Sequence, residues 1–381
     1  MNLLVVTFVV MMGLFLHPYV TYPFSLVLIR WIRGVDAPPQ LDTAAGPVSL
    51  SLLFCAYNEE QALPAKIANL RAIKRLVPEI QILAYCDMSS DASLHLLQQA
   101  GDVLTVVAAT ERTGKAAGMA RLVARATGEI CVFTDANVTL VPDTILNIPK
   151  YFADERVGGI AGSLRYVNEG ESSTALASGL YWRLEEAIKA SESALGSIMG
   201  ADGSIFATRR SLYPAVPPHL LDDMIVSMSV LLAGRRLAFA PDVIAHEKNT
   251  TLRADEYRRK RRIACRAFNT HRYLWPRILA AFSLLDLYKY ASHKLLRWFG
   301  FPILGLAVGA LALGLGAGAH PASLMALLAI LGTGLTLGAM RVQPFDLALD
   351  IAAAILGTFH GLIDACAGKK YQIWSPAQSR N

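Results

Sequence analysis

Hydrophobic and polar positions between residues 48 and 140 follow two different periods in turn. Apolar runs such as "VSLSLLFCA" and "EICVF" predict buried strands, whereas "QALPAKIANLRAIKRLV" and "GKAAGMARLVARATG" carry apolar residues at helical spacing. Two more strands, "IQILAYC" and "VLTVVAA", and one more helix, "SLHLLQQAG", continue the alternation. This order predicts an α/β fold with a doubly wound, mostly parallel sheet.

The two ends of the chain are apolar and uncharged. Residues 2–29 contain no Lys, Arg, Asp or Glu, and residues 299–340 lack them too, with His320 and Pro321 dividing that segment into two spans. Each span is long enough to cross about 30 Å of hydrocarbon. We therefore expect one N-terminal transmembrane anchor and two transmembrane helices near the C-terminus. A signal peptide is the alternative for the first span, but the basic start and the small-residue cleavage site are missing.

Charges beside the spans predict the orientation. Arg30 and Arg33 directly follow the first apolar segment, so the positive-inside rule places the central domain in the cytoplasm. We expect a protein of the bacterial inner membrane.

Two further segments mix apolar and charged residues. Residues 278–298 predict helices lying in the membrane interface. Residues 345–367 predict either an interfacial or re-entrant segment or a further transmembrane helix. The first is favoured, because a crossing there would place the basic tail outside. The expected parts are an anchor (residues 1–33), a cytosolic catalytic domain (34–254) and basic, amphipathic interfacial helices (255–298). Two transmembrane helices (299–341) and a last apolar segment with a basic tail (342–381) follow.

The composition agrees with a membrane protein. Of the 381 residues, 54% are hydrophobic and 17% are charged, against about 25% charged in soluble domains. The net charge of +6 suits contact with an anionic membrane surface, and no basic run interleaved with aromatic residues predicts nucleic-acid binding. The five cysteines are scattered without CxxC spacing, as is typical of buried thiols in a reducing compartment.

Polar side chains stand at the ends of three predicted strands, in "AYNEE", "CDMSSD" and "TDAN". Such sheets bind ligands beyond the carboxyl ends of their strands, although the same residues also cap turns and helices. The sequence contains neither GxGxxG nor GxxxxGK[ST], so it supports neither a Rossmann loop nor a P-loop. Asp135 and Asn137 of "TDAN" offer the oxygen donors that Mg²⁺ or Mn²⁺ prefers, with substrate phosphate completing the shell.

Six motifs in order over residues 48–275 resemble the inverting, nucleotide-sugar-dependent glycosyltransferases of family 2, whose fold is called GT-A. Within that family the chain is similar to the membrane enzymes of the cellulose, chitin and hyaluronan synthase type and the ceramide glucosyltransferase type. "CAYNEE" resembles the segment that opens the nucleotide pocket, "CDMSSDAS" the turn whose acid recognises the base, and "RTGKAAGMA" the Gly-Lys segment near the donor. "TDAN" resembles the Asp-x-Asp metal motif, "GADGSIFATRRSLY" the acceptor-side segment, and "LDDMIVSMSVLLAG" the Glu-Asp base motif. The chain departs from the family pattern at Cys86, Met88, Met119, Asn137 and Asp222.

The resemblance implies a set of site residues. They are Ala56, Tyr57, Asn58, Glu59, Asp87, Lys115, Asp135 and Arg262 for the donor, Asp202, Gly203 and Ser204 for the acceptor, Asp135 and Asn137 for the metal, and Asp222 and Asp223 for catalysis. The amphipathic segment "YWRLEEAIKASES" adds Trp182, either as a sugar platform on the acceptor side or as a buried anchor.

The chemistry of sugar transfer explains these residue types. A metal held through Asp135 would stabilise the departing diphosphate, and Asp223 would take the acceptor's proton as a general base. Asp222 and Asp223 precede an apolar run at helical spacing, so capping of a helix is their alternative role. Since Asn137 is neutral, we expect the metal to be held weakly until the donor binds.

The basic stretch "EYRRKRRIACRAFNTHR" stands where related membrane synthases carry a Gln-Arg-x-Arg-Trp motif. The Trp is missing here, which argues against processive synthesis, because that aromatic would stack on the acceptor sugar. Arg258, Arg262 and Arg266 are spaced for one helical face. We expect Arg262 to bind the pyrophosphate, with a polybasic helix on anionic lipid as the alternative.

The expected function is that of a membrane-anchored inverting hexosyltransferase. It would move a sugar from a UDP-sugar to a lipid-linked, glycolipid or polysaccharide acceptor. Two alternatives stay open: a processive polysaccharide synthase with translocation, and a non-catalytic membrane sensor or transporter that binds nucleotide sugars. The sequence also leaves the sugar, the acceptor and the oligomeric state open.

Overall fold

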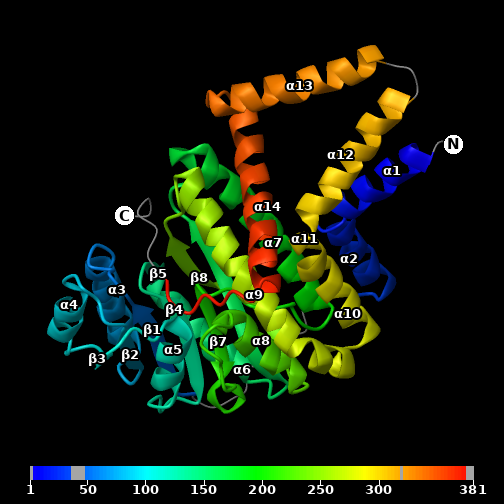
Figure 1. Cartoon of the computed structure of the whole chain (residues 1–381). Coiled ribbons are helices and arrows are strands. Elements are labelled where there is room, and N and C mark those ends of the chain that lie inside the picture. The colour runs from blue at the N-terminus through cyan, green and yellow to red at the C-terminus, as the bar shows by residue number, and fades with distance from the viewer. Residues whose placement is uncertain (1–2, 36–47, 318–320, 375–381) are drawn as a thin grey trace.

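A computed structural model describes residues 3–35, 48–317 and 321–374 of the chain (Figure 1). One eight-stranded sheet lies at the centre of its globular part, in the order β3-β2-β1-β4-β7-β6-β8-β5. The strands are β1 (Leu50–Ala56), β2 (Gln81–Cys86), β3 (Thr105–Ala108), β4 (Ile130–Asp135), β5 (Val138–Leu140), β6 (Val157–Tyr166), β7 (Ile205–Arg209) and β8 (Arg236–Glu247).

The sheet has a parallel half and a mixed half. β3, β2, β1 and β4 run parallel to one another. In the other half β7 runs antiparallel to both β4 and β6, β6 and β8 are parallel, and β5 is antiparallel to β8. The expected α/β fold is confirmed, with an antiparallel strand inserted at the centre of the sheet.

Both faces of the sheet are covered by helices, because residues along each strand alternate between two cores. On β1, Leu52 and Phe54 face the core that includes α3, whereas Leu53 and Cys55 face the core that includes α5, α8 and α9. The helices of the globular part are α3 (Leu63–Leu76), α4 (Ser93–Gln99), α5 (Lys115–Val123), α6 (Ile148–Phe152), α7 (Ser173–Ala194), α8 (Asp222–Leu232) and α9 (Arg253–Ala281).

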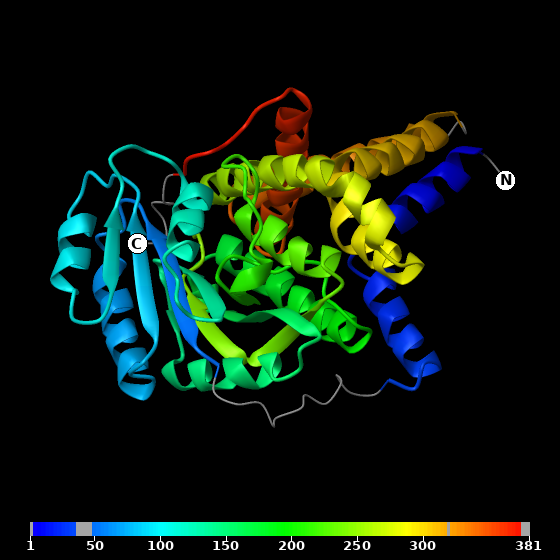
Figure 2. The ribbon, with the colours of Figure 1, turned by 90° about the horizontal axis from the view of Figure 1, so that it is seen from below.

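The apolar helices form an arm beside this domain (Figures 1 and 2). They are α1 (Leu3–Leu16), α2 (Thr21–Ile32), α10 (Leu284–Tyr290), α11 (Leu296–Trp298), α12 (Gly300–Ala317), α13 (Pro321–Ala339) and α14 (Phe345–Cys366). Within the described residues, α13 and α14 are long and apolar enough to cross a membrane, and the count rises to four if two bent pairs are each one span. These pairs are α1 with α2, bent by 67°, and α10–α11 with α12, bent by 70°. The N-terminal segment expected as one anchor is therefore two helices with a sharp bend.

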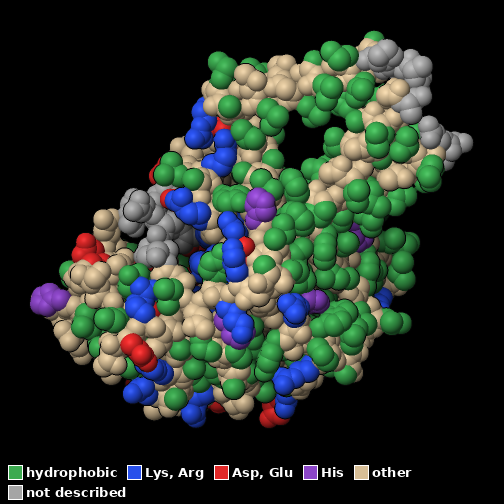
Figure 3. Space-filling model, viewed as in Figure 1, with side chains coloured by type: hydrophobic (Ala, Val, Ile, Leu, Met, Phe, Trp, Pro, Cys, Tyr) green, Lys and Arg blue, Asp and Glu red, His purple; other side chains and the backbone are tan. Residues whose placement is uncertain are grey.

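Helix α14 packs along α9 with a polar and small-residue face. Gly357 and Gly361 bring it against the backbone of α9, since an added Cβ on Gly361 would lie 2.3 Å from a backbone oxygen there. Asp364 pairs with Arg261 of α9 at 2.6 Å, and Asp350 pairs with Arg253 at the start of that helix. Apolar side chains gather on the other helices of the arm, which frame an opening with α14 (Figure 3). This helix therefore joins the globular domain although its composition would suit a membrane span.

A buried polar junction ties the arm to the globular domain. The two ring nitrogens of His293, which lies between α10 and α11, are 2.7 and 2.8 Å from carboxylate oxygens of Glu185 and Glu192 on α7. The Tyr22 hydroxyl of α2 donates to Glu192 at 2.5 Å, and Arg297 pairs with Glu185. Because buried charges are costly unless they are paired, this junction fixes both helical segments onto α7.

Candidate active site

The three polar strand ends lie side by side in the structure. Ala56 at the end of β1 pairs in register with Cys86 at the end of β2, and Cys55 pairs with Asp135 at the end of β4. The strands are parallel, so the segments that follow them leave the sheet at the same edge. The candidate active site is built on this edge.

The loop after β1 is tied to the loop after β2. Asn58 has a positive φ of 51°, and its side-chain oxygen accepts from the backbone N–H of Ser90 at 2.9 Å. The backbone N–H of Glu59 donates to Ser93 Oγ at 2.8 Å. Asn58 and Glu59 thus shape the rim of the site, and Tyr57 lies between them and the buried Ala56.

Asp87 is fully buried and has both carboxylate oxygens engaged. It accepts from the backbone N–H groups of Thr113 at 2.8 Å and Gly114 at 3.0 Å, and from Arg112 Nε at 3.2 Å. The guanidinium of Arg112 lies 3.2 Å from the centroid of the Tyr57 ring. The acid expected to recognise the base is therefore paired with an arginine of the same chain.

Lys115 and three carboxylates converge around Gly203. The Lys115 ammonium is 2.6 Å from Asp135 and 3.7 Å from Asp222. A Cβ added at Gly203 would meet Lys115 Nζ at 3.1 Å, Asp223 Oδ2 at 3.2 Å and Asp135 Oδ2 at 3.9 Å. Five of the residues predicted for donor, acceptor and catalysis thus meet at one point, although they come from four separate stretches of sequence.

The adjacent aspartates have opposite electrostatic surroundings. Burial, followed by the negative charge of Asp222, raises the pKa of Asp223 to about 7. Burial also acts to raise the pKa of Asp222, but the cations of Lys115 and Arg266 outweigh it and lower that pKa. The Arg266 guanidinium is 3.4 Å from Asp222. Two neighbouring acids whose pKa values are pushed apart are typical of sites that move protons.

Helix capping does not account for the two aspartates. Leu221 precedes the first residue of α8 and offers no side-chain cap. Within the described residues, one hydrogen bond is found for the Asp223 side chain. Its Oδ1 accepts from the backbone N–H of the next residue, Met224, at 2.6 Å. Asp222 faces Lys115 and Arg266 instead.

The oxygen donors near Asp135 fit a divalent cation that is completed by substrate. The Asn137 amide donates its N–H to Glu247 at 3.2 Å. Within the described residues no cluster of three His, Cys, Asp or Glu side chains could hold a metal alone. The Lys115 ammonium already lies against Asp135, so this carboxylate provides a seat for a cation. A metal bound there would need phosphate or water oxygens to complete its shell.

The expected acceptor residues line the other side of Gly203. Asp202 pairs with Lys189 of α7 at 2.8 Å, and the Ser204 hydroxyl donates to Glu247 at 3.2 Å. Trp182 is half-buried and packs edge-on against Tyr166, with the Lys189 ammonium 4.6 Å from its ring centroid. The indole of Trp182 is thus a packed side chain at the border of the site.

The arginines of α9 differ in their partners and in their exposure. Arg266 contacts Asp222, and the positive charge of Arg262 also lowers the pKa of Asp222. Arg258 pairs with Asp255 and is largely exposed. All three arginines lie on α9, so their four-residue spacing places them along one side of that helix as expected.

Two residues at this edge were not among the predicted site residues: Arg112 and Glu247. Arg112 stands three residues before Lys115 in a motif that the analysis had singled out, and Glu247 is the last residue of a strand. A search for charged residues at every strand end would have found Glu247. Arg112 has no such signal, because its partner Asp87 is 25 residues away in sequence.

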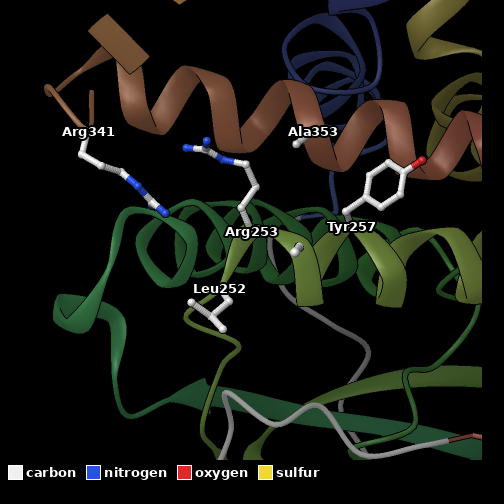
Figure 4. Close-up of a pocket in the computed structure, with 6 residues that line it drawn as sticks. Leu252, Arg253, Tyr257, Arg341 and Ala353 are labelled. Atoms are coloured by element: carbon white, nitrogen blue, oxygen red, sulfur yellow. The ribbon is translucent and has the colours of Figure 1, made fainter. Parts of the chain in front are cut away.

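A separate hollow of about 440 Å³ lies between the start of α9 and the corner from α13 to α14 (Figure 4). It is lined by Leu252, Arg253, Ala254, Tyr257, Arg341 and Ala353. Arg253 reaches from α9 toward α14, and its charge is already paired with two aspartates of that helix. This hollow is not part of the edge described above.

Comparison with known proteins agrees with this geometry. Residues 51–216 match glycosyl transferase family 2. An N-acetylglucosaminyltransferase of Rhizobium leguminosarum bv. viciae is 21% identical over 64% of this chain and 62% of its own length, and one of Rhizobium meliloti (strain 1021) is 24% identical over 57% and 55%. The chain thus spans less than two thirds of the length of these curated relatives.

A solved structure resembles almost the whole chain. The mannosyltransferase PcManGT from Pyrobaculum calidifontis, in complex with GDP-Man and Mn²⁺, superposes with a TM-score of 0.71 at 21% identity, covering 97% of this chain and 100% of that one. The likeness therefore extends from the sheet to the helical arm. Residues 51–216 are a glycosyl transferase family 2 domain, built on a GT-A fold and joined to helices that could span a membrane.

Proposed function

We propose that the protein is a membrane-bound, inverting glycosyltransferase that moves a sugar from a nucleotide diphosphate to an acceptor hydroxyl. The observation that carries this proposal is the convergence of Lys115, Asp135, Asp222 and Asp223 around Gly203. It supplies a cationic and metal-binding side for a diphosphate and a carboxylate of raised pKa for a hydroxyl. A simple binding protein would not need the second of these.

The proposed roles follow from the chemistry of each side chain. Lys115 and Arg262 bind the donor's phosphates. Asp135 and Asn137 would hold a divalent cation, which would supply positive charge to the leaving diphosphate. Asp223 accepts the proton of the acceptor hydroxyl as the new glycosidic bond forms and the bond to the diphosphate breaks. Asp222 stays ionised and holds Lys115 and Arg266 in place.

The donor is a nucleotide diphosphate sugar, and we favour a UDP-sugar. The names of the rhizobial relatives support UDP-N-acetylglucosamine as the first donor to test, and the name of the archaeal structure supports GDP-mannose as the second. Thermal-shift measurements with Mn²⁺ can separate them, because a ligand that binds the native state raises its apparent stability.

The acceptor is proposed to be amphiphilic, as a lipid-linked sugar or glycolipid would be. Apolar side chains dominate the helical arm beside the site (Figure 3), and a lipid tail would find a matching surface there. We propose the cytoplasmic side of a bacterial inner membrane as the place of reaction, with the basic residues at Arg30 and Arg33 facing the cytoplasm.

The test is release of the nucleoside diphosphate from UDP-N-acetylglucosamine and GDP-mannose by the purified protein, with Mn²⁺ and membrane lipid. Asp223→Asn is expected to lower the rate by about 10²–10⁴-fold, the usual contribution of a general base. Asp102→Asn is the matched control, because Asp102 pairs with Arg71 on the exposed surface. Donor binding without turnover in the unmutated protein would instead favour a nucleotide-sugar sensor.

A further inference from the structure

We propose that Arg112 occupies the place of the donor's base, and that the C-terminal segment Lys369–Trp374 covers it, so that a nucleotide must displace both to bind. This inference rests on the proposed donor site. It adds two elements to it: an internal competitor and a displaceable cover.

Arg112 makes the two contacts that a nucleobase would make with these groups. Its planar guanidinium lies 3.2 Å from the centroid of the Tyr57 ring, and its Nε donates to Asp87 at 3.2 Å. The uracil of UDP or the guanine of GDP also offers a planar face for stacking and a ring N–H for a carboxylate. Because the Tyr57 face and the Asp87 oxygen are both taken, the base and the arginine cannot use them together.

The place that Arg112 fills is otherwise well formed. Asp87 is held rigidly by the backbone N–H groups of Thr113 and Gly114. The backbone next to Tyr57 is held by the hydrogen bond from Ser90 N–H to the Asn58 side chain. Displacement of the Arg112 side chain would therefore expose a carboxylate that is already held in place.

The C-terminal segment lies over the same place. From the end of α14 it runs across to the loops that follow β2 and β3 (Figures 1 and 2). Arg112 Nη2 donates to the backbone oxygen of Trp374 at 2.9 Å, and the Trp374 ring meets the Tyr57 ring edge-on at 5.9 Å between centroids. The Gln372 backbone oxygen sits so close to Gly114 that a Cβ there would lie 2.2 Å from it.

This cover is held at its Lys369 end by contacts with α9 and α14. Asn269 of α9 donates to the Lys369 backbone oxygen at 3.0 Å, and Lys369 and Tyr371 both contact Asp364. Beyond Tyr371, Trp374 contacts Arg112 and Tyr57 and packs at the border of the core that includes α5, α8 and α9. Removal of Arg112 from the base site would break the hydrogen bond between Arg112 and the backbone oxygen of Trp374.

The expected effect on affinity has a definite sign. A protein whose competent form is a fraction of the total binds its ligand more weakly by that fraction. A charge-assisted hydrogen bond and a cation–π contact keep Arg112 in place. We expect Arg112→Ala to bind a nucleotide about tenfold more tightly than the unmutated protein, which corresponds to about 1.4 kcal/mol.

The experiment is calorimetric titration of the full-length protein in detergent with UDP and with GDP. Arg112→Ala is compared with Arg277→Ala, whose guanidinium also lies over a tyrosine ring, 5.6 Å from Tyr273, but on the exposed surface of α9. Arg112→Lys keeps the charge without the planar face, and its affinity should lie between the other two. If Arg112→Ala does not fold, Arg112→Lys shows whether loss of the planar guanidinium strengthens or weakens nucleotide binding.

A second readout follows the cover itself. Nucleotide should change the fluorescence of Trp374, and the change should be missing in Trp374→Phe. Tighter binding in Arg112→Ala together with this signal supports the inference. Weaker or unchanged binding overturns it, because Arg112 would then be a donor ligand or a bystander. If neither nucleotide binds the folded protein or its variants, the donor-site proposal itself fails.

Discussion

The raised pKa of Asp223 predicts a pH profile that one substitution should move. A general base works only when it is deprotonated, so the rate should fall about tenfold for each pH unit below its pKa. With the pKa of Asp223 at about 7, the acid limb of kcat/KM for diphosphate release should have its midpoint near neutrality. Burial is the main cause of the shift, and the charge of Asp222 is the second.

Asp222→Asn removes that second cause. A like charge within a few ångströms typically raises a carboxyl pKa by about one unit or more, and one unit equals about 1.4 kcal/mol. The substitution also leaves Lys115 and Arg266 without one of their carboxylates, and both cations lower the pKa of Asp223. The two effects have the same sign. The midpoint should therefore move to lower pH by about one unit or more.

The assay is kcat/KM from pH 5 to pH 9 with one donor and fixed Mn²⁺. The height of the profile can fall in Asp222→Asn, since Lys115 loses a partner, but the position of the acid limb is independent of that height. Asp102→Asn should leave the limb in place. An acid limb that stays put or moves to higher pH in Asp222→Asn would refute the assignment of Asp223 as the titrating base.

Three other substitutions test the surroundings of the site. Lys115→Met should raise the affinity of the free protein for Mn²⁺ by about tenfold or more in calorimetry, because the ammonium 2.6 Å from Asp135 competes with the metal. Burial lowers the pKa of Lys66 to about 7, so folding releases its proton between about pH 7 and pH 10.5 and stability should rise over that window; Lys66→Met should lack this rise in thermal melts. Gly361→Ala should destabilise the protein by about 1–3 kcal/mol, since its Cβ would lie 2.3 Å from the backbone of α9, whereas Gly305→Ala, with nothing within 4 Å, should not.

The sequence was sufficient for the parallel half of the sheet and for the edge where the site lies. Strands β1, β2 and β4 are buried apolar runs that end in polar residues, and that pattern is local. The insertion of β7 between β4 and β6 is not local, because it depends on pairing across more than 40 residues. Hydrophobic periodicity carries no information about such pairing.

The sequence of α14 contains a pattern that predicts its packing against the globular domain. Asp346, Asp350, Gly357, Gly361 and Asp364 recur at spacings of three, four and seven, which places them on one face of a helix. Acids and glycines on one face of an apolar helix favour packing against a basic protein surface over exposure to lipid. The position of Arg112 over Tyr57 could not have been predicted, because it depends on side-chain geometry alone.

The buried junction of His293 with Glu185 and Glu192 has a mechanical consequence. Because it joins the arm and the globular domain through paired, buried groups, it holds Asp223 at a fixed distance from the helices that could span a membrane. A catalytic domain on a loose tether could reach hydroxyls at many depths. In the proposed reaction, the fixed catalytic domain would select an acceptor by how far its reactive oxygen projects from the lipid surface.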